Sequence, residues 1–135
     1  MNHHVITIDR KINLEASNIV NMLDNVDAVI HLAAQTSVFN TNTEQICEDN
    51  ITTFIKIANA CNDKHVKLVY ASSSTANNCN TTSLYGLSKR FDEEYASIYC
   101  PSATGVRLHN VWSENPREGT LMWCLLNKEN TVLFN

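Results

Sequence analysis

The stretch from Val66 to Lys89 constrains this chain most, because it predicts a strand, a polar turn and a helix in close succession. Val66–Ala71 is an apolar run with the length of a buried strand. Three serines, at positions 72 to 74, follow it. A helix is expected from about Tyr85 to Tyr99, since Pro101 cannot continue it.

Tyr85 and Lys89 lie four residues apart at the start of that helix, so their side chains share one face about one turn apart. A tyrosine hydroxyl is a poor base at neutral pH. A lysine ammonium roughly 5 Å away, at an effective dielectric of about 20, favours the phenolate by about 3 kcal/mol. The positive end of the helix dipole acts in the same direction. The pair predicts a proton donor and acceptor, and the alternative is an ordinary surface pair.

Apolar periodicity predicts alternating helices and strands in the rest of the chain. Asp27–Leu32 is a nearly continuous apolar run, which is typical of a strand in a parallel sheet. The pattern indicates an α/β fold. The other expected strands are His4–Ile8, Ala103–Leu108 and Thr131–Phe134, and the other expected helices are the one capped by Asn13, Thr43–Asn62 and Gly119–Asn127.

Composition narrows the classes of function. The chain has 135 residues, of which 44% are hydrophobic, and this suits one domain with a core. The net charge of −4 is spread without a basic stripe, so a nucleic-acid partner has no electrostatic support. No apolar run reaches membrane-spanning length and the start does not resemble a signal peptide, which favours a cytoplasmic protein without a membrane partner. The cysteines are odd in number and form no C-x-x-C pair, so we expect reduced thiols and no metal site.

Four blocks in order resemble the extended short-chain dehydrogenase/reductase family, and most closely its NAD-dependent nucleotide-sugar epimerases and dehydratases. They are Val29–Gln35, Asn50 with Ile51, Val66–Lys89 and Gly105–Val111, and the likeness covers about residues 26 to 117. The resemblance implies a Rossmann-like, three-layer parallel sheet. It also implies NAD as the cofactor, with NADP possible, and a nucleotide-sugar as the substrate.

The resemblance assigns roles to matching positions. Tyr85 matches the acid/base, Lys89 the cation that activates it, and Ser74 the hydroxyl that orients the substrate oxygen. Asn110 matches a substrate contact. The positions that match cofactor contacts are Asp9, Leu32, Ala33, Ala34, Gln35, Asn50, Tyr85, Lys89 and His109.

Several of these positions have a plainer interpretation. The alanines after the Asp27–Leu32 strand fit a tight turn as well as they fit close approach of a ligand. Asn50 fits a solvent-facing position, and His109 fits a structural role at a strand end. A serine run such as 72 to 74 also occurs at the start of ordinary loops.

The chain departs from the family pattern in three places. Thr53 and Phe54 stand where the family usually has Gly-Thr, which predicts different local helix packing. Ala76–Asn78 replaces Val-Tyr-Gly, and the following loop is short, so part of the lid over the sugar is expected to be absent. Trp112–Glu114 replaces Tyr-Gly-Pro, which predicts a different backbone path.

The family's glycine-rich turn, which holds the cofactor pyrophosphate on backbone amides, has no counterpart among Gly86, Gly105 and Gly119. The spacing from Asp9 to Asp27 suits the family's third strand, with roughly 60 residues, or two βα units, missing ahead of it. The chain is then one truncated domain, 1–135, in which Asp9 approaches the adenine. We expect His4–Ile8 to pair with Asp27–Leu32, or a partner chain or second copy to complete the sheet.

Two classes of function follow from this sequence. The first is an NAD(P)-dependent nucleotide-sugar epimerase, dehydratase or reductase that uses Ser74, Tyr85 and Lys89. The second is a catalytically inert remnant or binding module of the same fold, because the phosphate-binding turn is missing. Serine hydrolase chemistry is disfavoured, since the chain has no Gly-x-Ser-x-Gly elbow.

Overall fold

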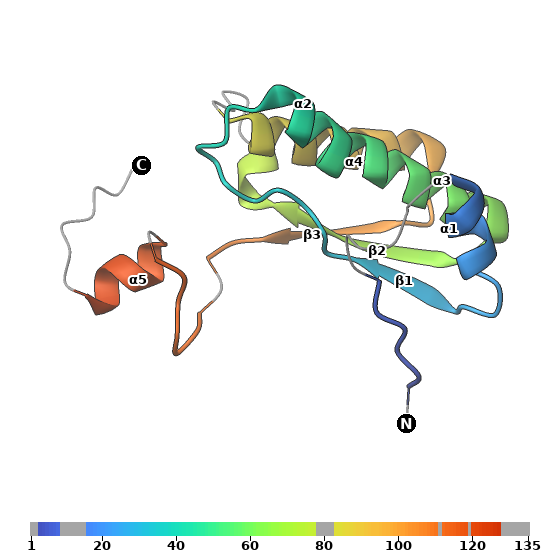
Figure 1. Ribbon diagram of the computed structural model, residues 1–135, viewed down its shortest axis with the longest axis horizontal. Coiled ribbons are helices and arrows are strands. Elements are labelled where there is room, and N and C mark those ends of the chain that lie inside the picture. Colours follow the sequence, from blue (N-terminus) through green and yellow to red (C-terminus); the bar gives the residue numbers. More distant parts are fainter. Residues whose placement is uncertain (1–2, 9–15, 78–82, 111, 119, 128–135) are drawn as a thin grey trace.

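The computed structural model describes residues 3–8, 16–77, 83–110, 112–118 and 120–127. Within them the chain forms a three-stranded parallel sheet in the order β1-β2-β3 (Figure 1). The strands are β1 (Ala28–His31), β2 (Lys67–Ser73) and β3 (Thr104–Leu108). Because the strands are parallel, their carboxyl ends meet at one edge of the sheet.

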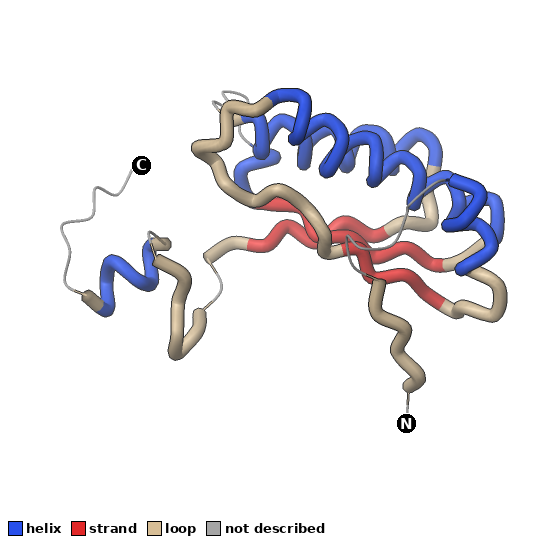
Figure 2. The backbone as a smooth tube through the Cα atoms, in the orientation of Figure 1, coloured by secondary structure: helices blue, strands red, loops and turns tan. Residues whose placement is uncertain are grey.

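Helices cover one face of this sheet (Figures 1 and 2). The longest are α3 (Thr53–Lys64) and α4 (Leu84–Tyr99), and α1 (Ala16–Met22) packs beside α3. A short α2 (Thr43–Ile46) continues through a π-helical segment, Cys47–Thr52, into α3. Helix α5 (Leu121–Leu126) lies beyond the end of β3, apart from the sheet (Figure 1).

The core lies between β2 and the helices. Alternate residues of β2 point toward the helices, and Leu68 and Tyr70 are 1% and 5% exposed. Phe54 of α3 is fully buried, and its ring meets that of Tyr70 edge-on at 4.9 Å. No helix of the described residues covers the opposite face of the sheet, where Ile30 is 70% exposed. The described residues therefore form two layers, a sheet and one layer of helices, of the three that the resemblance implies.

The predicted α/β class with a parallel, incomplete sheet is confirmed. Strands β1, β2 and β3 and helices α1, α4 and α5 lie where the apolar pattern placed them. The expected helix Thr43–Asn62 corresponds to the continuous run from α2 to α3. The proposed cap Asn13 and the expected final strand Thr131–Phe134 lie outside the described residues.

The strand expected at His4–Ile8 is wrong, and so is its pairing with Asp27–Leu32. These residues form no strand, and β1 pairs only with β2 among the described strands. Val5 and Ile6 are 77% and 64% exposed. A β-branched run favours a strand only where neighbours pack against it and its backbone groups find partners, and the described residues supply neither to His4–Ile8. Completion of the sheet by another chain stays a prediction.

Gly105 provides the first test of this packing. It lies opposite Tyr70 in the β2–β3 register, and a Cβ atom at Gly105 would stand 2.6 Å from Tyr70 Oη and 2.7 Å from Cζ. The ring cannot swing away freely, since it is buried against Phe54. Alanine normally stabilises a strand by about 0.5–1 kcal/mol relative to glycine. We expect Gly105→Ala instead to lower the free energy of unfolding by about 1–3 kcal/mol.

Urea denaturation measures this change. The exposed turn residue Ser102, replaced by alanine, is the control and should stay within about 0.5 kcal/mol of the wild type. A Gly105→Ala variant as stable as the wild type would contradict the packing described for Tyr70.

Candidate active site

A cleft of about 440 Å³ opens at the carboxyl edge of the sheet. The loop that leaves β1 for α2 runs from this edge (Figure 2). The cleft is lined by residues from the three strand ends, from the start of α4 and from the segment after β3. Seven predicted site residues are among them: Leu32, Ala34, Ser74, Tyr85, Lys89, His109 and Asn110.

The three serines at the end of β2 all line this cleft, and their hydroxyl groups are engaged differently. Ser72 Oγ donates to Glu93 Oε1 at 2.5 Å. Ser73 Oγ lies 2.9 Å from Thr75 Oγ1 and accepts from the Thr75 amide at 3.2 Å, so it shapes the turn. Ser74 is half-buried, and its hydroxyl has no hydrogen-bond partner in the described part of the chain. Ser74 is therefore the serine whose hydroxyl remains available to a ligand.

Helix α4 brings Tyr85 and Lys89 to the same cleft. Ser83 caps the helix by accepting from the Gly86 amide at 3.0 Å, which fixes Leu84 and Tyr85 in the first turn. Tyr85 is half-buried, whereas Lys89, one turn later, is only 3% exposed. The four-residue spacing thus places both side chains against one space, as the helical pattern predicted.

Lys89 has an anionic partner that sequence reasoning missed. Its Nζ donates to Asp92 Oδ2 at 3.0 Å, and the Asp92 side chain is fully buried. Asp92 Oδ1 has no partner among the described atoms. Burial raises the pKa of Asp92 to about 6, and Lys89 acts in the opposite direction. The available signal was that Asp92 follows Tyr85 by seven residues, on the helix face that packs inward.

His31, the last residue of β1, is a second buried polar group near Lys89. It is 6% exposed, its Nε2 atom has no partner among the described atoms, and its ring lies 6.0 Å from that of Phe54. Burial lowers its pKa to about 4, and the charge of Lys89 adds to this. His31 is therefore neutral at physiological pH.

Asn50 joins the strand-end loop to α4. It is fully buried in the π-helical segment, so the solvent-facing interpretation is wrong. Its Oδ1 accepts from the Gln35 amide at 2.7 Å, and its Nδ2 donates to Gln35 O at 3.1 Å and to Ser88 Oγ at 2.9 Å. Ser88 also donates to the backbone carbonyl of Tyr85 at 2.8 Å. Asn50 thus fixes the position of the loop after β1 relative to the start of α4, and both line the cleft. Its place in a π-helical turn is typical of functional sites.

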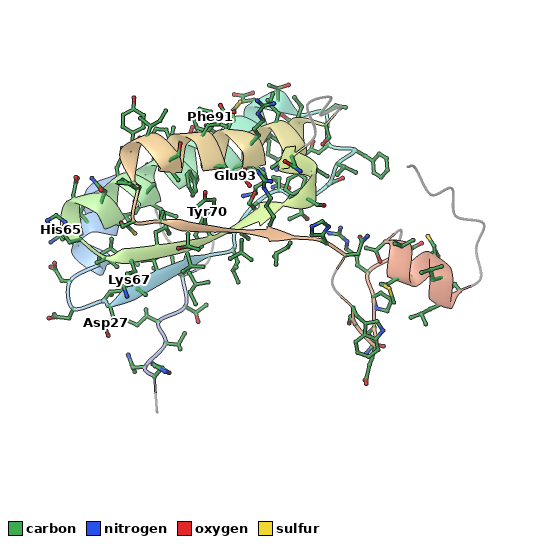
Figure 3. All side chains as sticks on the ribbon, turned by 180° about the vertical axis from the view of Figure 1, so that it is seen from behind. Asp27, His65, Lys67, Tyr70, Phe91 and Glu93 are labelled. Carbon is green, nitrogen blue, oxygen red and sulfur yellow. The ribbon has the colours of Figure 1, made fainter. Side chains whose placement is uncertain are left out.

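Glu93 holds α4 against the strands (Figure 3). Besides accepting from Ser72, it receives two hydrogen bonds from Arg107 of β3, from Nε at 2.8 Å and from Nη2 at 2.6 Å. The Arg107 guanidinium holds the pKa of Glu93 below its usual range. Arg107, the next-to-last residue of β3 and close in sequence to the expected cofactor contact His109, is thereby paired with α4.

Three described residues of the prediction, Ala33, Gln35 and Asn50, are not part of the cleft lining. Ala33 and Gln35 belong to the loop after β1, Asn50 is hydrogen-bonded to Gln35, and Asp9 falls outside the described residues. Among the described residues no group of His, Cys, Asp and Glu is arranged to hold a metal, and the four described cysteines are free. No described helix combines the length and apolarity needed to cross a bilayer.

Arg117 and Thr36 also line the cleft, although neither was predicted as a site residue. Arg117 Nη1 donates to Thr36 Oγ1 at 3.2 Å across a separation of 81 residues. This contact brings the segment after β3 over the strand-end loop and adds a cation to the cleft.

Comparison with known proteins identifies one matching family. The model of the NAD dependent epimerase/dehydratase family matches residues 2–128, nearly the whole chain. A search of curated proteins found no match.

Solved structures with the same fold include three sugar-nucleotide proteins. MoeE5, solved with UDP-glucuronic acid and NAD, has a TM-score of 0.70 and 23% identity over 82% of this chain and 44% of its own. UDP-glucuronic acid 4-epimerase from Bacillus cereus, solved with NAD, has a TM-score of 0.68 and 19% identity over 85% of this chain and 44% of its own. dTDP-4-dehydrorhamnose reductase from Bacillus anthracis, solved with NADP, has a TM-score of 0.61 and 19% identity over 74% of this chain and 42% of its own. This chain thus spans less than half the length of each, and identities this low establish the fold alone.

His31 makes the stability of the fold depend on pH. Its folded pKa of about 4 lies below the ordinary value of 6.5, so between these values the unfolded chain binds more protons. The stabilisation is complete above about pH 6.5 and is lost as the pH falls through 4. We expect the wild type to lose on the order of 3 kcal/mol more than His31→Leu between pH 6.5 and 4, measured by urea denaturation.

Replacement of the exposed His4 by leucine is the matched control, and its loss over the same interval should equal that of the wild type. Equal losses for His31→Leu and the wild type would show that His31 is not buried as a neutral side chain.

Proposed function

Because the chain belongs to the NAD dependent epimerase/dehydratase family, we propose that its cleft holds the nicotinamide end of NAD against a nucleotide-sugar, with Ser74, Tyr85 and Lys89 as the proton-transfer triad. The observation that carries the proposal is the cleft itself. Three side chains expected to act together, one from the 3₁₀ turn that follows β2 and two from the first turns of α4, line one space large enough for a sugar.

The residues at the strand ends fit the flat ring of a nicotinamide. Ala34 leaves the backbone open to a ligand, and Leu32 and His109 lie on the same cleft. Lys89 and, behind the loop, Asn50 complete the proposed cofactor contacts, with Asp9 toward the adenine. The described residues include no glycine-rich turn, so the contacts argued from the cleft are those at the nicotinamide end, and the Asp9 contact rests on the family match alone. Bound NAD supplies the hydride acceptor, and NADP is the second candidate cofactor.

Each member of the triad has a separate task at the sugar hydroxyl. Tyr85 accepts the hydroxyl proton when the carbinol is oxidised and returns it on reduction. Lys89 stabilises the tyrosinate that this requires. Ser74 donates a hydrogen bond from Oγ to the same substrate oxygen and fixes its position. Asn110, at the far wall of the cleft, binds the nucleotide-sugar.

The ligands of the similar structures support this class of substrate. MoeE5 was solved with UDP-glucuronic acid and NAD, and the Bacillus cereus epimerase with NAD. A UDP-sugar is therefore the first substrate to test. This chain spans only 44% of the length of each of those proteins, so the similarity does not establish their activity for it, and catalysis by this chain is itself proposed.

A binding module without turnover is the second candidate. One observation favours it: Asp92 already pairs with Lys89 and neutralises its charge. On this candidate the cleft binds a nucleotide or a sugar and no proton is transferred.

Calorimetric titration with NAD and NADP tests the proposal, followed by turnover of UDP-glucuronic acid read from chromatographic separation of the sugar-nucleotide products, because epimerisation and dehydration return the hydride and leave no reduced nicotinamide to measure. We expect sub-millimolar binding of one cofactor. Tyr85→Phe should lower turnover by about 10²–10⁴-fold, because it removes the proton acceptor, and leave cofactor affinity within about threefold. The matched control is Tyr99→Phe, which makes the same change at an exposed position of α4 and should alter neither quantity.

Each other outcome has a definite meaning. Absence of heat with both cofactors at millimolar concentration would refute NAD binding by this chain. Binding without turnover in the wild type would select the binding module. A large loss of cofactor affinity in Tyr85→Phe would mean that Tyr85 holds the cofactor and is not the proton carrier.

A further inference from the structure

Tyr85, Lys89 and Asp92 form a row on one face of α4, at positions i, i+4 and i+7. Lys89 stands between the other two, with Tyr85 about one turn before it and Asp92 about one turn after it. Its Nζ lies 3.0 Å from Asp92 Oδ2, and the two side chains are 3% and 0% exposed. The ammonium that should stabilise the tyrosinate is therefore already paired with a buried carboxylate.

We propose that Asp92 is a positioning residue that competes with Tyr85 for the charge of Lys89, and thereby sets the pH at which Tyr85 ionises. The inference rests on the proposed function of Tyr85 and Lys89, and it adds a residue to which that function gives no part. Asp92 touches neither substrate nor cofactor in this proposal, because it acts through Lys89.

The physical reason is charge cancellation at close range. An isolated ammonium attracts a nearby phenolate with its full charge, whereas an ammonium paired with a carboxylate offers mainly the weaker field of a dipole. Burial keeps counterions and water from screening either charge. Ionised Asp92 therefore makes the tyrosinate harder to form, and protonated Asp92 releases the full effect of Lys89.

The pKa of Asp92 determines the pH range over which its carboxylate is charged and competes with Tyr85 for Lys89. Burial raises it to about 6, so the carboxylate is charged at pH 7 and above and takes up a proton below pH 6. Hence we expect the restraint on Tyr85 to operate throughout the range in which a tyrosine ionises.

The other titratable groups around the pair do not replace Asp92. His31 of β1 faces Lys89 and is neutral above about pH 4. Glu93 of α4 raises the pKa of Asp92 slightly, but its own charge is taken up by Arg107 of β3. Tyr70 of β2 lies near Asp92, and because its pKa is raised to about 12 it stays protonated through most of the range.

The test follows the ionisation of Tyr85 by NMR in the cofactor-free chain, with ¹³C in the ring carbon that bears the hydroxyl. The Tyr85→Phe variant identifies the Tyr85 resonance. Asp92→Asn removes the charge and keeps both the shape and an oxygen acceptor for Lys89. We expect the midpoint of Tyr85 ionisation to fall by about one pH unit in Asp92→Asn. An unchanged or higher midpoint would overturn the proposal.

The matched control is Glu94→Gln, the same loss of charge on the same helix at an exposed carboxylate that pairs with Arg90. Solvent screens this charge, so the Tyr85 midpoint should move by less than about 0.2 pH unit. A shift as large as that of Asp92→Asn would mean that net charge, and not the pairing with Lys89, controls Tyr85.

A second variant covers the case in which Asp92→Asn does not fold, since it leaves Lys89 buried beside a neutral partner. The double variant Lys89→Met with Asp92→Leu replaces the pair by apolar side chains, a change that proteins often tolerate. If Asp92 cancels most of the Lys89 charge, the Tyr85 midpoint should stay within about half a pH unit of the wild type. A rise of about two units would show that Lys89 acts uncompensated, and would overturn the proposal.

These measurements separate the inference from the proposed function, because they need neither cofactor nor sugar. If the calorimetry finds no NAD binding while the Asp92→Asn shift appears, the proposed function fails and the inference holds. If NAD binds and Tyr85 is needed for turnover but no shift appears, the inference alone fails.

Discussion

The Glu93 carboxylate joins helix α4 to strands β2 and β3, and the position of the candidate active site depends on this connection. It accepts hydrogen bonds from Ser72 at the end of β2 and from Arg107 in β3, so one side chain of α4 is fixed to two strands. Charge-assisted bonds of this kind are strong and directional. These hydrogen bonds determine the distance of α4 from the sheet and its rotation about its own axis. They therefore determine where the side chains of Tyr85 and Lys89 enter the cleft. The chemistry proposed for those two side chains depends on this attachment.

Much of the fold was predictable from local pattern. The apolar runs that became β1 and β2 and the helix that became α4 are recorded in consecutive residues, so periodicity finds them. Tyr85 and Lys89 were found in the same way, because a four-residue spacing fixes a shared helix face. These predictions needed only neighbours within about one turn or one strand. Ser74 was assigned from the family resemblance, because spacing alone does not separate it from Ser72 and Ser73.

What the sequence left out depends on contacts between distant residues. His4–Ile8 has the composition of a strand, but it does not pair with the open edge of β1 in the described sheet. Arg117 meets Thr36 across 81 residues, and no local pattern records that meeting. Asp92 was missed because the sequence does not show that it is buried. On an exposed helix face, a carboxylate three residues after Lys89 would form an ordinary surface ion pair with little effect on Lys89.

The π-helical turn around Asn50 also restricts the length of the chain at that point. A π turn accommodates one residue more than an α turn, so the helix before Cys47 and the helix after Thr52 keep a fixed angular offset. Loss of one residue from this segment would restore ordinary α winding, and because an α turn completes the same rotation with one residue fewer, the two flanks would stay nearly aligned. Phe54 would then keep its place in the core, whereas Asn50, inside the wide turn, would lose its placement toward Gln35 and Ser88. Residues here are thus more easily exchanged than deleted.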